Sequence, residues 1–121
     1  MSTSDETRAV ILAFHDAFNT HDVDAIMALM TDDVVFDDAT GPDGEAYIGT
    51  EAVRGYWARF FASSPGAWFE PEDMFVADDR CGFAWRFTFD KSKPDGDHVR
   101  GVDFFRVRDG KVAEKFSYIK G

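Results

Sequence analysis

The sequence predicts an α+β domain in which helices pack on one face of a curved antiparallel sheet. Two observations predict this class. Apolar residues recur at helical spacing in the first third of the chain and again near its middle, whereas the chain after residue 66 alternates as strands do. The length of 121 residues is enough for one domain and too little for two, so we expect a single domain over residues 1–121.

Two helices are predicted at the start of the chain. The first runs from Thr3 to about Asn19 and carries one apolar stripe, formed by Val10, Ile11, Phe14, Ala17 and Phe18. The second is shorter, begins after Asp22 as an N-cap residue and ends near Thr31.

A strand and a third helix follow. Three consecutive β-formers at residues 34–36 predict a short strand, and the Gly-rich, acidic residues 40–49 predict a loop. The third helix is expected to begin at Thr50 and to end before residues 63–66, whose Ser-Ser-Pro-Gly sequence stops a helix.

The rest of the chain predicts four antiparallel strands, at residues 67–77, 83–89, 98–108 and 111–119. Pro71 cannot donate to a neighbouring strand, so the first of them is expected to lie at an edge or to contain a bulge. Turns are predicted at residues 94–96 and at Asp109-Gly110, a strong two-residue hairpin signal.

Composition excludes several classes of function. The chain has 13 Lys and Arg against 23 Asp and Glu, a net charge of −10, which disfavours nucleic acid and anionic membranes as partners. Its one cysteine, Cys81, allows no internal disulfide. We find no leader-like or membrane-spanning stretch and no metal or nucleotide motif, so we expect a cytoplasmic protein without metal or cofactor.

Asp103 is predicted to point into the protein interior. A regular hairpin around residues 109–110 pairs Asp103 with Phe116 and Gly101 with Tyr118. The other residues on this strand face are apolar: Val99, Phe105 and Val107. An isolated carboxylate there would cost several kcal/mol, so we expect Asp103 to stay protonated near neutral pH and to donate a hydrogen bond.

A second inward carboxylate is expected after the strand at residues 34–36. Asp38 shares a strand face with Phe36, whereas Asp37 lies on the other face, so Asp38 is the better candidate. Both aspartates could instead cap the strand end in water. Two inward carboxylates would suit proton transfer, one as general base and the other as donor to an enolate oxygen.

The segments FNTHDVDAIMALMTDDVVFDDATG (18–41), IGTEAVRGYW (48–57) and RGVDFFRVRDGKVAEKFSY (100–118) resemble the nuclear transport factor 2-like superfamily. Within it they resemble the SnoaL-like polyketide cyclases and the ketosteroid isomerases. The resemblance implies one SnoaL-like domain, built as a cone-shaped sheet wrapped around the N-terminal helices, the cystatin-like roll. It also implies an internal pocket and, frequently, a homodimer through the open face of the sheet.

The resemblance also implies roles for individual residues. Asp38 matches the general base of the isomerases, and Asp103 matches their protonated oxyanion-hole aspartate. Their tyrosine donor on the first helix falls at Phe14, which cannot donate a hydrogen bond. Tyr118, expected near Asp103, could take its place.

Two functional hypotheses remain after this reading. The first is a pocket protein for a hydrophobic carbonyl compound, active as an isomerase or cyclase with Asp38 and Asp103 as catalytic residues. The second is a non-catalytic ligand-binding or protein-interaction module of the same fold. Pocket-lining candidates are Phe14, Phe18, Phe36, Tyr56, Trp57, Phe105, Phe116 and Tyr118. The aromatic strand at residues 83–89 either lines the same hollow or forms a dimer patch.

Overall fold

Apart from one additional short strand, β2 (Ala46–Ile48), the elements follow the predicted order. The structure is a computed structural model that describes residues 3–93 and 95–120. Its elements are α1 (Thr3–Asn19), α2 (Val23–Ala28), β1 (Met30–Asp37), β2 (Ala46–Ile48), α3 (Thr50–Ser63), β3 (Trp68–Ala77), β4 (Arg80–Thr88), β5 (His98–Arg108) and β6 (Lys111–Ile119). Pro94, in one of the expected turns, lies outside the described residues.

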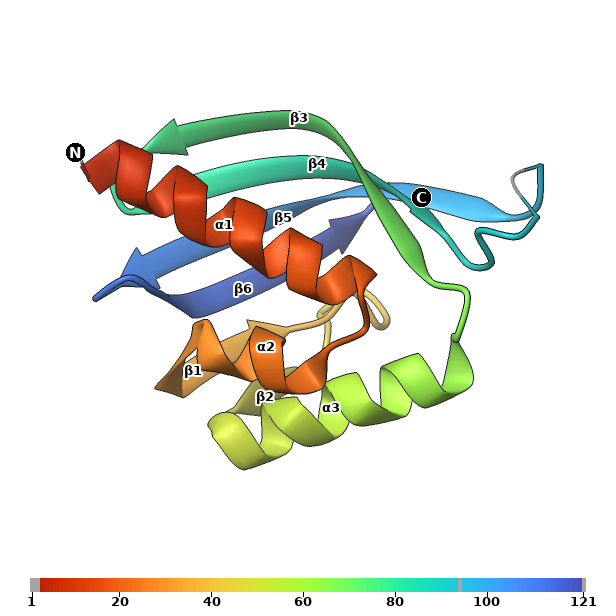
Figure 1. Cartoon of the computed structure of the whole chain (residues 1–121), viewed down its shortest axis with the longest axis horizontal. Helices are drawn as coiled ribbons and strands as arrows, with labels where there is room; N and C mark the ends of the chain where they lie inside the picture. The colour runs from red at the N-terminus through yellow and green to blue at the C-terminus, as the bar shows by residue number, and fades with distance from the viewer. Residues whose placement is uncertain (1–2, 94, 121) are drawn as a thin grey trace.

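The strands form one six-stranded sheet in the order β2-β1-β6-β5-β4-β3. Neighbouring strands from β3 to β6 are antiparallel, whereas β1 pairs with β6 in parallel. Figure 1 shows the sheet curving over α1, with α3 beside β1 and β2 at the other end. No helix in the described part of the chain is long and apolar enough to cross a membrane.

Strand pairing explains why two predictions, the end of the second helix and the loop at residues 40–49, were wrong. The second helix ends at Ala28 and not near Thr31, because Met30 already pairs with Val112 of β6. The segment expected to be entirely loop contains β2, whose Tyr47 pairs with Phe36 of β1. Neither pairing has a local signal in the sequence.

Predictions from the local sequence were correct where the backbone chemistry of a residue determines the geometry. β3 is an edge strand, and its register shifts at Pro71, as a residue without an N–H requires. Asp109 and Gly110 both adopt positive φ, at 53° and 74°, the conformation of the tight turn that a two-residue hairpin favours.

A β-bulge in the β5–β6 hairpin decides which side chains face the core. Val107 pairs with Val112, but Arg106 pairs with Glu114, so Ala113 is the extra residue on β6. Because side chains alternate along a strand, one extra residue moves every later side chain of β6 to the opposite face.

The bulge makes the predicted pairing of Asp103 wrong. Asp103 lies opposite Ser117, whereas Phe116 pairs with Phe104 on the outer face of the sheet. Tyr118 lies on that outer face too and is 58% exposed. Phe116 and Tyr118 therefore do not line the interior, and Tyr118 is not the donor beside Asp103.

Candidate functional site

A cavity of about 230 Å³ lies between the helices and the concave face of the sheet. Most of its wall is aromatic, formed by Phe18, Phe36, Tyr56, Trp57, Phe60, Phe69, Trp85, Phe87 and Phe89. The charged side chains in its wall are Asp38, Asp103 and Lys115. An aromatic hollow with a few polar groups is typical of small-molecule sites.

The aromatic strand β4 faces this interior. Trp85 and Phe87 are buried and line the cavity together with the residue Phe89 that follows the strand. Phe83, buried as well, is paired with Asp103 of β5. Trp85 packs closely against Gly101 of β5, and its ring would lie 2.7 Å from a Cβ at that position.

Asp103 points inward as predicted, but it is not isolated. Its Oδ2 lies 3.3 Å from Nζ of Lys115, and both side chains are almost fully buried. The bulge at Ala113 brings this lysine to the Asp103 face and turns Glu114 outward, where it pairs with Arg106. Asp103 therefore has a lysine partner that the sequence prediction did not include.

Several groups hold Lys115 in the cavity wall. Its Nζ donates a hydrogen bond to Ser117 Oγ at 2.9 Å and lies 4.4 Å from the centre of the Phe36 ring and 5.5 Å from that of Trp57. Burial lowers the pKa of Lys115, and the Asp103 carboxylate opposes this shift without cancelling it.

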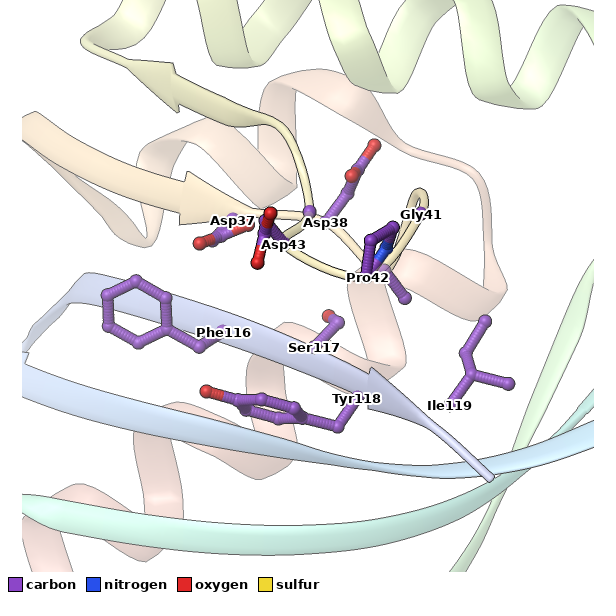
Figure 2. Close-up of a pocket in the computed structure, with 11 residues that line it drawn as sticks. Asp37, Asp38, Gly41, Pro42, Asp43, Phe116, Ser117, Tyr118 and Ile119 are labelled. Carbon is purple, nitrogen blue, oxygen red and sulfur yellow. The ribbon is translucent and has the colours of Figure 1, made fainter. Parts of the chain in front are cut away.

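Asp38 also faces the cavity. Its Oδ1 accepts hydrogen bonds from the backbone N–H groups of Thr40 and Glu45, at 2.9 and 3.0 Å, and its Oδ2 accepts one from the Thr40 hydroxyl at 2.9 Å. Figure 2 shows its carboxylate directed toward the helices, while that of Asp37 points elsewhere. Of the two adjacent aspartates, Asp38 is therefore the one in the cavity wall, and its own loop fixes its orientation.

Tyr56 adds a neutral hydroxyl to the same wall. Burial raises the pKa of Tyr56, and the negative charge of Asp38 raises it further. The hydroxyl group stays protonated at physiological pH and can donate a hydrogen bond.

Phe14 and Phe105, also predicted to bind substrate, belong to the core behind the cavity. They are 1% exposed, their rings pack 5.7 Å apart, and neither lines the cavity. His15, beside them, is stacked on Phe83 at 3.8 Å. Burial lowers the pKa of His15 to about 4, and neither ring nitrogen has a hydrogen-bond partner among the described residues.

A second hollow of about 300 Å³ lies on the other side of the loop after β1. Residues of that loop and Phe116 to Ile119 of β6 line it, as Figure 2 shows. This is where Phe116 and Tyr118 are found. Its wall is more polar than that of the aromatic cavity, and the two hollows share Asp38, Ala39, Ser117 and Ile119.

Comparison with known families identifies the class of protein to which this fold and cavity belong. The family model of the SnoaL-like domain matches residues 11–115, so the chain belongs to the SnoaL-like domain family. No match was found among curated proteins.

Solved structures share the fold over the whole chain. An NTF2-like protein of unknown function from Mesorhizobium loti is 34% identical, with a TM-score of 0.85 over 100% of this chain and 96% of its own. A candidate polyketide cyclase from Xanthomonas campestris pv. campestris is 26% identical, with a TM-score of 0.75 over 98% and 93%. A candidate ketosteroid isomerase from Kribbella flavida shares the fold at 20% identity, with a TM-score of 0.81 over 100% and 82%.

Proposed function

We propose that this chain binds a hydrophobic carbonyl compound in the aromatic cavity and moves a proton on it, as an isomerase or cyclase. The observation that carries the proposal is one apolar hollow with a carboxylate, Asp38, and an oppositely charged pair, Asp103 and Lys115, in its wall. Relatives named as candidate cyclase and isomerase support the same class of chemistry.

In this mechanism Asp38 is the general base. Its Oδ2 accepts only the Thr40 hydroxyl among the described residues, which leaves a lone pair on that oxygen for a proton from the ligand. The ligand's carbonyl oxygen would lie toward Asp103 and Lys115, where the ammonium group of Lys115 stabilises the enolate. Returning the proton from Asp38 to a different carbon completes an isomerisation. In a cyclisation the enolate carbon instead attacks a second carbonyl of the ligand, and the alkoxide that forms takes up the proton from Asp38.

A non-catalytic binding module is the second candidate. The three hydrogen bonds that Asp38 accepts from its own loop favour it, because a carboxylate that only stabilises a loop makes bonds of this kind. The two candidates differ in whether a bound ketone exchanges its α-protons.

Exchange of α-protons therefore tests the proposal. With 2-tetralone in deuterated buffer, the native protein is expected to accelerate deuterium incorporation at the α-carbons, followed by mass spectrometry. Asp38→Asn is expected to reduce this acceleration by about 100-fold or more, because the amide cannot accept the proton. Quenching of tryptophan fluorescence monitors binding, because Trp57 and Trp85 line the cavity.

The matched control is Asp37→Asn, an adjacent carboxylate that does not line the cavity. It is expected to retain the exchange rate of the native protein. Binding without accelerated exchange in the native protein would favour the binding module, and equal loss in both variants would remove Asp38 from the role of base.

A further inference from the structure

We infer that Lys115 is the group that contacts the ligand's oxygen, and that the cavity takes ring compounds whose oxygen is anionic or becomes so, as in phenols and enolisable ketones. Asp103 and Ser117 are then positioning residues that hold the ammonium group. The inference deepens the proposed function and rests on the same cavity, but it requires no proton transfer from carbon.

Lys115 is more accessible than Asp103, and its partner carboxylate is not fully hydrogen-bonded. The lysine side chain retains 7% exposure and the aspartate side chain 2%. The second carboxylate oxygen of Asp103, Oδ1, is buried and has no hydrogen-bond partner among the described residues. Both residues line the cavity, and Lys115 is the more exposed of the two.

The hydrogen-bonding capacity of Lys115 is not fully used. An ammonium group has three N–H donors. One is directed to Ser117 Oγ and one to Asp103 Oδ2, and within the described chain no further oxygen accepts from Nζ. The third donor is left for an oxygen that the protein does not supply.

The surroundings of Lys115 select the kind of oxygen. Aromatic rings exclude water from Nζ, so a charge that approaches it is screened much less than in solvent. A neutral carbonyl oxygen gains one hydrogen bond there, whereas a phenolate or enolate oxygen gains a charge-assisted one. Among the described residues that line the cavity, Lys115 is the cation, and Asp38 would repel an anionic oxygen from its own side.

The experiment measures the ionisation of 4-nitrophenol bound to the protein, from the absorbance of its phenolate. The bound dye is expected to ionise at lower pH in the native protein than in Lys115→Met, so that the phenolate binds this variant at least about 10-fold more weakly. Lys111→Met removes an exposed lysine from the same strand and is expected to bind the phenolate as the native protein does.

A second variant keeps the test decisive if Lys115→Met does not fold. Asp103→Asn keeps the lysine and removes the negative charge beside it. Because this change also makes Lys115 easier to deprotonate, the two proteins are compared at the lowest pH at which both are folded, where the variant is expected to bind the phenolate at least as tightly as the native protein. Weaker phenolate binding in Asp103→Asn would identify Asp103 as the contact and overturn the inference. So would unchanged binding in a folded Lys115→Met.

The two proposals fail separately. Loss of α-proton exchange with the dye shift intact contradicts the proton-transfer function and leaves the Lys115 contact in place. Intact α-proton exchange, together with a bound dye that ionises at the same pH in the native protein and in Lys115→Met, contradicts the Lys115 contact and leaves the proton-transfer function in place.

Discussion

Replacing Asp103 with alanine is expected to lower the free energy of unfolding by about 3 to 5 kcal/mol, because it leaves the Lys115 ammonium group buried without its partner. The loss is expected to shrink as the pH rises. Burial already lowers the pKa of Lys115, and without the carboxylate the folded protein gives up that proton more readily than the unfolded chain does. Urea denaturation at about pH 6 and about pH 9 measures both effects.

Two further variants test whether the loss of stability comes from the unpaired charge of Lys115. The double variant Asp103→Leu with Lys115→Met replaces both charges by apolar side chains and is expected to recover most of the lost stability. Asp24→Ala breaks an exposed pair with Arg54 and is expected to have a much smaller effect. Equal losses in Asp103→Ala and Asp24→Ala would show that the buried pair is not the source of the effect.

His15 is expected to make the fold sensitive to acid. Burial lowers its pKa from 6.5 to about 4, so between these values the unfolded chain binds a proton that the folded protein does not. Stability therefore falls as the pH is lowered through 6.5 toward 4, and the contribution lost is about 3 kcal/mol at about 1.36 kcal/mol for each pKa unit.

Comparison with His15→Phe isolates this contribution, because phenylalanine keeps the ring against Phe83 and cannot be protonated. The variant is expected to lose about 3 kcal/mol less than the native protein between about pH 7 and about pH 4 in urea denaturation. His98→Gln, at an exposed position, controls for the loss of a histidine as such. Parallel pH profiles of the native protein and His15→Phe would contradict the account.

The sequence was sufficient for elements that local chemistry determines. The helix bounds of α1 and α3 and the turn at Asp109-Gly110 follow from capping, apolar spacing and backbone preference. The end of α2 and the existence of β2 were missed, because they depend on pairing with strands that are distant in the chain. Such pairing has no local signal.

The residues of the candidate site also fall into those that the sequence could predict and those that it could not. Asp103 and Phe36 lie in strands of regular alternation, so their inward direction could be predicted. Lys115 could not, because the bulge at Ala113 has no glycine or proline to mark it. The adjacent apolar pair Val112-Ala113 is the one local break in alternation that could have suggested it.

A crystal structure of the protein with bound 4-nitrophenolate tests the central claim most directly, since it measures the distance from the phenolate oxygen to Nζ of Lys115. We predict a charge-assisted hydrogen bond of about 2.7 to 2.9 Å, with the ring in contact with the aromatic residues that line the cavity. A dye bound instead in the hollow between the loop after β1 and Tyr118, or bound in the cavity with its oxygen away from Lys115, would contradict the claim.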